Sequence, residues 1–511
     1  MTVTNSIAIQ TRNLTKTFDE VVACEKISFD VRRGEIIALL GENGSGKTTL
    51  MNMLSGIYFP DSGNIEVNGK EVSIRSPKDA FDLGIGMVHQ HFKLVDVFSA
   101  TENIILGLPG KAFLNRKAQS RVIGDLCDRY GFELDPDKKI YDMSVSEKQT
   151  VEIIKVLYRG ADILILDEPT AVLTPHETES LFVTLRNMKE DGKAIVIITH
   201  KLHEVLAVSD RVHILRKGKS IATVNTSETN QQELTEMMVG RAVSLSIDRP
   251  KVSGKQLRLQ VEGLNCLTHD GVKILQDVAF NLSSGEILGV AGIAGSGQKE
   301  LCESLAGLYP ITSGSILYSP DVDQSMDIVG MSPKEIQHLG INFAFVPEDR
   351  LGMGLVANMD MTDNLLIRHY NDGRGPFTDR KSPKLQAEEM IKQLHIVTPG
   401  VSTPVRRLSG GNVQKILLGR EISSAPRVLI VAYPVRGLDI NSSYTIYDLI
   451  NEQKVHGAAV LFIGEDLDVL LELSDRIMVL CGGQVSGIVD AKTTTKEQVG
   501  LLMTQVPVDR I

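Results

Sequence analysis

Hydrophobic residues in this chain gather in short runs of Val, Ile and Leu, and these runs alternate with stretches of helical spacing. Among the longest are Ala194–Ile198 and Ala459–Ile463, which have the length of a buried strand and fall far short of the ~20 apolar residues that span a bilayer. Alternating strands and helices predict an α/β core with a mostly parallel sheet. A more helical stretch over residues 100–159 predicts a helical subdomain beside that core.

The same pattern occurs twice along the chain. Gly34–Gly41 (GEIIALLG) recurs as Gly285–Gly292 (GEILGVAG), and Asp210–Val212 (DRV) recurs in the same order as Asp475–Ile477 (DRI). A repeat on this scale indicates that one whole domain is present in two copies, since each copy carries its own strands, helices and motifs.

The repeat sharpens what length suggests about domains. A chain of 511 residues is expected to form roughly two to four domains, and the duplication narrows this to two. We expect the first domain over residues 1–245 and the second over residues 257–511. The linker is predicted at residues 246–256, where Pro250 and Gly254 interrupt a polar stretch.

Composition then excludes several classes of protein. Asp and Glu (64) outnumber Lys and Arg (54), and the resulting formal net charge of −10 argues against bulk binding to nucleic acid. The five cysteines lack zinc-ligand or redox spacing, and Met1–Gln10 lacks the charged start and apolar run of a secretory signal. We therefore expect neither a membrane-spanning nor a secreted protein, although a subunit that binds a membrane protein remains open.

A glycine-rich loop follows the repeated strand in the first copy. Its sequence, GENGSGKT, stands between an apolar strand and a helix, which is the context that a phosphate-binding loop requires. Glycines let backbone N–H groups converge on phosphates, and the helix N-terminus adds partial positive charge. Lys47 would neutralise the β- and γ-phosphates, and the Thr48 hydroxyl would ligate Mg²⁺. The predicted ATP-binding residues here are Gly41, Asn43, Gly44, Ser45, Gly46, Lys47, Thr48 and Thr49.

Two later strands of the first copy end in polar residues. Ile163–Leu166 leads into Asp167 and Glu168, and carboxylates in such a place are costly unless they meet a cation or a reacting water, although they could also cap a helix. Asp167 suits a Mg²⁺ shell, and Glu168 suits polarising the attacking water. The strand over residues 194–199 leads into His200, which could bond the γ-phosphate or could be an ordinary satisfied polar residue.

A third motif makes the combination specific. Leu408–Asn412 (LSGGN) stands just before a helix, and with the loop and the acidic strand it resembles the ATP-binding-cassette ATPases. The resemblance implies two tandem cassettes, each with a phosphate-loop α/β core, a small antiparallel β part and a helical subdomain, and it implies ATP and Mg²⁺ as cofactors. In that family two cassettes pack head to tail, so that each ATP lies between the phosphate loop of one and the signature of the other.

Further site residues follow from the same resemblance. Phe18 would stack on adenine, Gln90 would be the Q-loop residue that touches Mg²⁺, and residues 173–175 (LTP) would form the D-loop. The resemblance thus implies Glu168, His200 and Gln90 as catalytic residues, Thr48, Gln90 and Asp167 as metal ligands, and Ser409, Gly410, Gly411 and Asn412 as signature residues that contact ATP.

The second copy departs from the family at its own phosphate site. Gln298 replaces the loop lysine, and Lys299 replaces the threonine of the Mg²⁺ shell. The other changes are Ala432 and Tyr433 in place of Asp167 and Glu168, Glu348 in place of Gln90, and Glu465 in place of His200.

The first copy is altered instead in its signature, Met143–Glu147 (MSVSE). Ser146 stands where the family has a glycine, and Glu147 adds a negative charge. Under head-to-tail packing, the unaltered motifs of both copies fall in one composite site. The altered motifs, including Ser144 and Ser146, fall in the other. We therefore predict an asymmetric ATPase with one hydrolytic site and one degenerate site.

Two fused cassettes without membrane spans resemble the ATPase subunits of bacterial sugar and nucleoside importers. The sequence at residues 87–92 (MVHQHF), 158–175 and 346–350 (VPEDR) is similar to that of the nucleoside branch. The binding proteins of that branch are lipoproteins of the basic-membrane-protein type. This similarity implies a peripheral position on the cytoplasmic face of the cell membrane, two transmembrane permease subunits of different sequence, and no direct contact with the cargo. Residues 91–94 and 349–355 would line the grooves for the permease.

Two other functions stay open. The same machinery could serve a monosaccharide importer of the ribose or galactose type. A soluble twin-cassette protein that acts on ribosomes or DNA is a different class, but it is disfavoured by the net charge and by the lack of a long charged linker or cysteine zinc modules.

Overall fold

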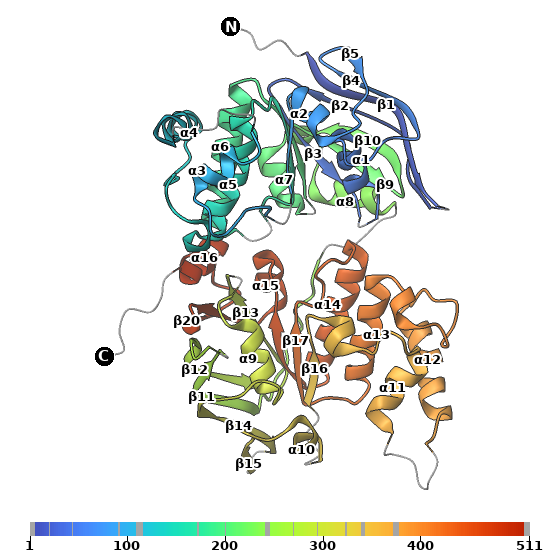
Figure 1. Ribbon diagram of the computed structural model, residues 1–511. Helices are drawn as coiled ribbons and strands as arrows, with labels where there is room; N and C mark the ends of the chain where they lie inside the picture. The colour runs from blue at the N-terminus through green and yellow to red at the C-terminus, as the bar shows by residue number, and fades with distance from the viewer. Residues whose placement is uncertain are drawn as a thin grey trace. The chain divides into compact units, whose positions relative to one another are not determined.

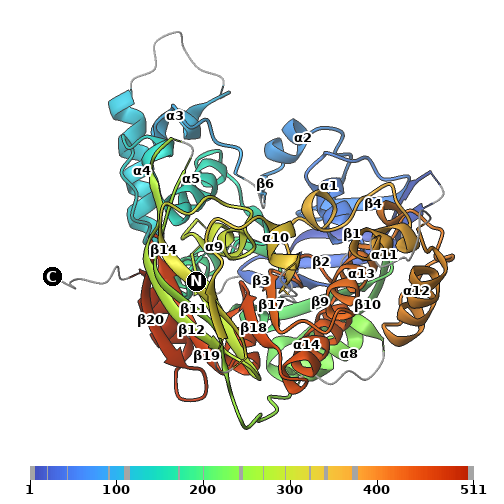
Figure 2. The same ribbon diagram turned by 90° about the horizontal axis from the view of Figure 1, so that it is seen from below.

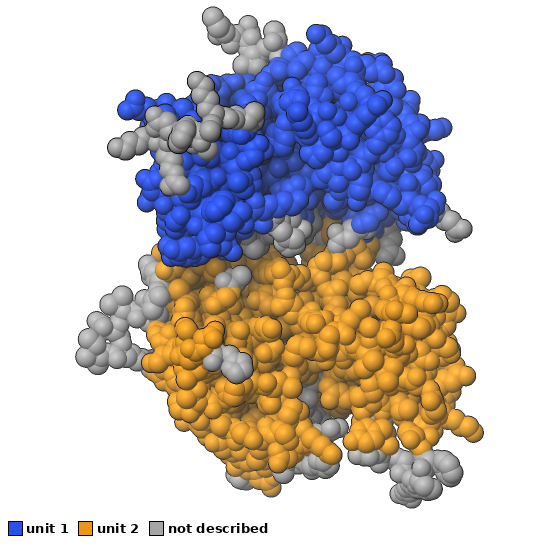
Figure 3. All heavy atoms as spheres, viewed as in Figure 1, with its two compact units in different colours: residues 1–244 blue, residues 245–511 orange. Residues whose placement is uncertain are grey.

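The computed structural model divides into two compact units, residues 1–244 and 245–511, each with its own sheets and core (Figure 3). The structure describes residues 6–19, 21–42, 44–89, 92–108, 116–170, 173–199, 201–240, 246–268, 270–293, 295–321, 324–338, 343–370 and 378–504.

Unit 1 is built on two sheets. The larger is parallel except for one edge strand, in the order β6 (Ile85–Val88), β7 (Ile163–Asp167), β8 (Ala194–Ile198), β3 (Glu35–Leu40), β9 (Arg211–Arg216) and β10 (Lys219–Asn225). The smaller is antiparallel, in the order β2 (Val21–Arg32), β1 (Ile7–Phe18), β4 (Ser62–Val67) and β5 (Lys70–Val72).

The helices of unit 1 form two groups. Around the large sheet lie α1 (Lys47–Leu54), α2 (Pro77–Asp82), α6 (Pro175–Glu190), α7 (Leu202–Val208) and α8 (Gln231–Val239). The helical subdomain contains α3 (Ala100–Ile105), α4 (Arg116–Tyr130) and α5 (Val145–Tyr158), which lie together away from the antiparallel sheet (Figures 1 and 2). The predicted helical stretch at residues 100–159 is therefore confirmed.

Strands of the large sheet are buried on both faces, which explains their continuous hydrophobic runs. Along β7, Ile163 and Ile165 pack with α1 and the antiparallel sheet, while Leu164 and Leu166 pack on the other face with α5 and α6. The antiparallel strand β2 alternates instead over its second half, where Ile27, Phe29 and Val31 are buried and Ser28 and Asp30 are not.

Unit 2 repeats this architecture. Its large sheet runs in the order β16 (Phe343–Val346), β17 (Val428–Ala432), β18 (Ala459–Ile463), β13 (Glu286–Gly292), β19 (Arg476–Cys481) and β20 (Gln484–Asp490). Its antiparallel sheet runs β12 (Lys273–Ser283), β11 (Leu257–Leu267), β14 (Ser313–Asp321) and β15 (Gln324–Asp327). The predicted fold class, two tandem α/β cassettes, is confirmed.

The helices of unit 2 also fall into the same two groups. Around the large sheet lie α9 (Gln298–Leu305), α10 (Pro333–His338), α14 (Ile440–Val455), α15 (Leu467–Leu473) and α16 (Lys496–Thr504). The helical subdomain contains α11 (Met361–His369), α12 (Lys381–Gln393) and α13 (Gly410–Ile422), and a short π-turn at Arg350–Gly354 precedes it. No described helix has both the length and the apolar composition to cross a membrane.

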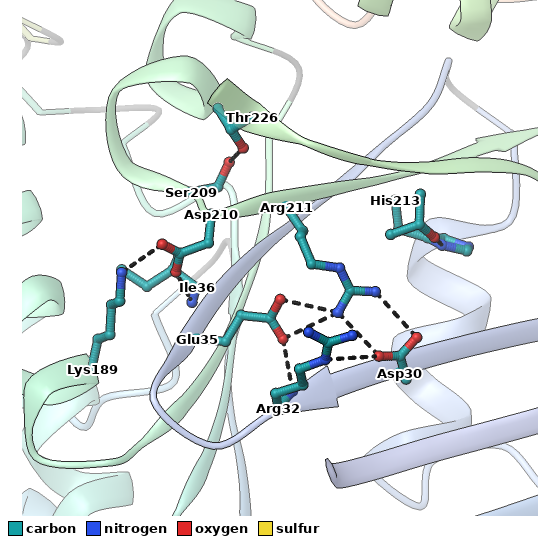
Figure 4. A network of polar contacts seen from close by, with 11 residues as sticks. Asp30, Arg32, Glu35, Ile36, Lys189, Ser209, Asp210, Arg211, His213 and Thr226 are labelled. Carbon is teal, nitrogen blue, oxygen red and sulfur yellow. Dashed lines mark hydrogen bonds and ion pairs between the residues drawn. The ribbon is translucent and has the colours of Figure 1, made fainter. Parts of the chain in front are cut away.

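A polar network explains why the DRV motif is repeated. In unit 1 the Arg211 guanidinium lies between Asp30 and Glu35, 3.0 Å from an oxygen of each, which joins the two sheets (Figure 4). The Asp210 carboxylate accepts from the backbone N–H of Ile36 at 2.9 Å and from Lys189 Nζ at 2.5 Å, which joins β3 to α6.

Unit 2 contains the matching contacts. The Asp475 carboxylate accepts from the backbone N–H of Ile287 at 2.9 Å and from the fully buried Lys454, and Arg476 Nε lies 2.6 Å from Glu286. The same residues thus brace both copies, so the repeated motif reflects architecture and not catalysis.

Candidate active site

The phosphate loop of unit 1 joins β3 to α1 and is shaped by its glycines. Gly44 and Gly46 have φ of 78° and 99°, in the left-handed region where a side chain is strained. A Cβ on Gly46 would also lie 2.5 Å from the carbonyl oxygen of Ala23. Among the described residues no side chain caps the N-terminus of α1, so its backbone N–H groups face the loop.

Lys47 lies inside this loop and is 9% exposed. Its Nζ donates to the carbonyl oxygens of Gly41 at 2.6 Å and Glu42 at 3.1 Å. Burial lowers the pKa of Lys47, while the charges of Glu168 and Asp167 act to raise it. The fold therefore brings the loop lysine close to the two carboxylates at the end of β7. This proximity is what the motifs predict for a single site.

Two observations test whether the phosphates of ATP fit this loop. The Ser45 hydroxyl is buried and has no hydrogen-bond partner among the described residues. No described residue lies within 4 Å of the place where a Cβ of Gly44 would stand. Open space beside an unpartnered hydroxyl and the buried Lys47 ammonium matches the acceptors and the charge of a polyphosphate, so the residues present fit ATP.

Asp167 and Glu168 stand at the carboxyl end of β7. Burial raises the pKa of Asp167 to about 6, and the neighbouring Glu168 adds to the rise, while Lys47 opposes it. A carboxylate that is held in place against this cost suits a cation, and Mg²⁺ prefers such oxygen ligands. Glu168 has a φ of 50° and donates its N–H to the Ile198 carbonyl at 2.8 Å, a strained conformation of the kind found at functional sites.

The remaining predicted residues of unit 1 are placed as follows. Phe18 is 39% exposed, stacks edge-on against Tyr58 with 5.1 Å between ring centroids, and lies 5.5 Å from Lys16 Nζ. Thr48 is exposed and Thr49 half-buried in the first turn of α1. Asn43, Gln90 and His200 lie outside the described residues.

The loop of unit 2 keeps the shape of its counterpart and loses its charge. Gly295 and Gly297 have φ of 87° and 97°, and Gln298 is buried with Nε2 donating to the Ile293 carbonyl at 3.1 Å, where Lys47 makes the matching bond. Lys299 does not restore the charge, because its side chain is 62% exposed and its ammonium lies 3.8 Å from Glu303 on α9.

The end of β17 shows the same retention of shape. Tyr433 has a φ of 48° and donates its N–H to the Ile463 carbonyl at 2.9 Å, which reproduces the backbone of Glu168. Burial raises the pKa of its phenol, and the charges of Glu465 and Glu348 add to the rise, so Tyr433 carries no negative charge to offer water or metal at neutral pH. Ala432, beside it, has no ligand atom and is buried.

The two signatures differ in how their helices begin. In α5, Ser144 and Glu147 form a capping box: Glu147 accepts from the Ser144 N–H at 2.7 Å and also lies 2.6 Å from Lys138 Nζ. The Ser144 hydroxyl accepts from the Glu147 N–H in the first turn, so a hydroxyl and a carboxylate already occupy the start of α5 next to Ser146. This arrangement leaves the positive end of the helix poorly suited to receive a phosphate.

In α13 the first turn is open. Ser409 is the N-cap residue but its hydroxyl accepts from Asn412 Nδ2 at 2.9 Å, and no side chain caps the helix among the described residues. Gly411 lies against α14, since a Cβ there would be 2.8 Å from the Ser442 hydroxyl, and Gly410 lies beside Arg350. Backbone N–H groups at an uncapped, glycine-lined helix start can approach phosphate closely.

Two charged residues at these sites are not part of the sequence motifs. Lys138 pairs with Glu147 in unit 1, and Arg436 pairs with both Glu348 and Glu465 in unit 2. The sequence holds a signal for Arg436, because an arginine replaces Ala171 in the copy where Glu348 and Glu465 add negative charge.

Comparison with known proteins agrees with this reading of the two units. The family model described as ABC transporter matches residues 24–171 and 275–434, one match in each unit. The nucleoside import ATP-binding protein NupA of Lactococcus lactis subsp. cremoris is 43% identical over 504 residues, 98% of each chain. The guanosine import ATP-binding protein NupO of Bacillus subtilis is 42% identical, with 97% of each chain covered.

More distant similarity extends over the same length. The ribose import ATP-binding protein RbsA 1 of Streptomyces avermitilis is 39% identical over 96% of this chain and 92% of its own. A solved archaeal ribosome recycling factor, in complex with a ribosomal stalk protein, has a TM-score of 0.59 and 17% identity over 91% of this chain and 87% of its own, which shows a shared fold alone. The chain therefore belongs to the ABC transporter family, as an ATPase made of two cassettes.

Proposed function

We propose that this chain is the ATP-hydrolysing motor subunit of a bacterial nucleoside importer. Relatives named for nucleoside and guanosine import share 43% and 42% identity with it, against 39% for a ribose import relative, and all align over nearly the full length. The cargo is assigned from these relatives, because a motor subunit of this kind does not contact what is carried.

The ATPase would have one competent composite site. Each cassette supplies one half: residues 1–245 the phosphate loop with Lys47, and residues 257–511 the signature with Gly411, with residues 246–256 as the linker. The observation that supports this proposal is that the charged residues of the phosphate site are present in unit 1 and replaced in unit 2. Lys47, Asp167 and Glu168 interact in unit 1, whereas Gln298 keeps only the shape of its loop in unit 2.

Catalysis would rest on positioning and electrostatics, as in phosphoryl transfer generally. Lys47 and the open first turn of α13 would balance the phosphate charge from two sides, and Glu168 would orient the attacking water, with Gln90 and His200 as the other residues near the γ-phosphate. Mg²⁺, held by Thr48, Asp167 and Gln90, would supply further positive charge. Closing the cassettes on ATP and reopening after hydrolysis would drive the partner.

The partners would be two transmembrane permease subunits and a substrate-binding lipoprotein, with this chain on the cytoplasmic face of the membrane. Residues 91–94 and 349–355 would face the permease. Exposed apolar residues support that surface: Leu351 and Met353 lie within the second segment, and Val95, Val97, Val356 and Met359 lie just after the two segments.

The decisive experiment combines one variant with two measurements. Glu168→Gln should lower ATP turnover roughly 10²- to 10⁴-fold, because water loses its orienting carboxylate, while ATP binding is retained. Uptake of a labelled nucleoside should stop in cells that carry only this variant. Normal turnover by Glu168→Gln would reject the assignment.

A monosaccharide importer is the second candidate, because the ribose import relative is similar over nearly the same length. Uptake assays with labelled guanosine and labelled ribose in a deletion strain separate the two. Loss of ribose uptake with intact nucleoside uptake would favour the sugar.

A further inference from the structure

Three loops of unit 2 meet at the side chain of Arg436. Arg436 follows β17, and its Nε lies 3.3 Å from Glu465, which follows β18. Its other guanidinium nitrogen forms an ion pair and hydrogen bond with Glu348, which follows β16. Because β16, β17 and β18 are neighbours in one parallel sheet, these residues lie at the same edge, where a competent cassette would hold nucleotide.

The residues in contact are changes from the first copy that fit one another. Glu348 and Glu465 add negative charge where the first copy has Gln90 and His200, and Arg436 adds positive charge where it has Ala171. Independent decay would leave two carboxylates that repel each other. A guanidinium placed between them indicates that the three positions act as one set.

The same loop continues to the signature of unit 2. The Arg350 guanidinium donates to the backbone carbonyl of Arg436, and a Cβ on Gly410 would stand 3.1 Å from that guanidinium. Beyond the loop, α14 contacts Gly411 through Ser442. The Arg436 loop therefore contacts Arg350, which lies beside Gly410, and continues along the chain into α14, which lies beside Gly411.

Stability is a poor explanation for this network. The side chains of Arg436, Glu348 and Glu465 are 54%, 37% and 49% exposed, and exposed ion pairs contribute little to folding. Their effect is to restrain three loops relative to one another, which bound nucleotide and metal would do in a competent cassette.

We propose that Arg436 is a positioning residue, which cross-links the three loops of the degenerate site and so holds the signature of unit 2 ready for the ATP bound to unit 1. This inference rests on the proposed function, because it assumes that the signature of unit 2 completes the site of Lys47.

The test is made on the purified full chain with four variants. Arg436→Ala should lower kcat for ATP about tenfold, since small displacements of a positioning group cost this much or more. The affinity of the unit 1 loop for a fluorescent ATP analogue and the thermal midpoint should stay unchanged. Arg436→Lys should recover part of kcat, and Glu348→Gln/Glu465→Gln should match Arg436→Ala. Arg380→Ala, which removes an exposed arginine paired with Asp363 in the same unit, is the matched control and should be silent.

The combined effect of the substitutions on kcat shows whether the three residues act as one network or independently. Combining Arg436→Ala with the two glutamine substitutions should lower kcat no further than Arg436→Ala alone. A wild-type kcat in Arg436→Ala would overturn the inference. If Arg436→Ala does not fold, a wild-type kcat in the double glutamine variant would overturn it. Glu168→Gln serves as the reference: if it turns over ATP normally the proposed function fails, whereas an inactive Glu168→Gln beside a fully active Arg436→Ala rejects only the positioning role.

Discussion

At the scale of single residues, Lys47 and Gln298 show how shape and charge separate. Both are buried and both bond a backbone carbonyl of their own loop, yet only Lys47 carries charge. A loop can thus keep its fold after its phosphate chemistry is gone, because the fold needs the hydrogen bond and catalysis needs the ammonium.

The pair gives a matched prediction. Lys47→Ala should lower ATP turnover about 10²-fold or more, since it removes a cation that stabilises developing phosphate charge. Gln298→Ala should leave turnover within about twofold of wild type, because no charge is lost. Steady-state phosphate release measures both, and a comparable loss in the two variants would contradict a single hydrolytic site.

A second prediction at this scale concerns pH. Asp167 has a pKa of about 6 in the folded chain, above its ordinary 3.8, so between these values the folded state holds a proton that the unfolded state has released. Stability of the nucleotide-free chain should therefore fall as pH rises through this window. Asp167→Asn removes that fall, and its thermal midpoint should exceed that of wild type more at about pH 7.5 than at about pH 4.5. The exposed Asp82 on α2 is the control position, and an equal shift with Asp82→Asn would contradict the assignment.

At the scale of elements, the two signature helices, α5 with 14 residues and α13 with 13, differ in how they begin. The start of α5 is capped by Ser144 and Glu147 together, whereas the first turn of α13 has no side-chain cap among the described residues and contains glycine. Sequence alone placed a helix after residues 408–412 and a helical stretch over residues 100–159, because motifs and helical spacing are local. It did not show that Glu147 caps its own helix and pairs with Lys138, since that depends on where the chain before α5 passes.

Exchanging the residues of the two signatures tests this contrast. Gly411→Ser should lower kcat about tenfold or more, because a side chain there would meet Ser442 and displace the first turn of α13. Ser146→Gly, the reverse change in unit 1, should leave kcat unchanged. The test compares kcat for ATP of the two variants under conditions where they are equally stable. A loss of kcat in Ser146→Gly alone would reverse the assignment of the two signatures.

At the scale of the whole molecule, the altered parts distribute unevenly over two similar folds. The bracing networks around Asp210 and Asp475 are alike, while the phosphate sites differ. Each core keeps the contacts that join its sheets and helices, while Lys47, Asp167 and Glu168 of unit 1 are replaced by Gln298, Ala432 and Tyr433 in unit 2.

This asymmetry predicts the binding stoichiometry. In the Glu168→Gln background, which retains ATP, the chain should bind nearly one ATP rather than two, and the added Lys47→Ala change should abolish it. Gln298→Ala should have no effect on the ratio. Equilibrium dialysis measures the ratio directly, and two ATP per chain would show that the loop of unit 2 still binds nucleotide without the lysine.

The sequence by itself determined the α/β class, the duplication and the identity of the motif residues, because periodicity, repeats and phosphate loops are written in neighbouring positions. Only the tertiary structure decided which charges meet: Lys47 with Asp167 and Glu168, Glu147 with Lys138, and Arg436 with Glu348 and Glu465. The contacts of Lys47 and Arg436 join residues at the ends of different strands, and Lys138 reaches Glu147 from the segment between α4 and α5. Their distances depend on the packing of the whole sheet, and spacing along the chain does not encode them.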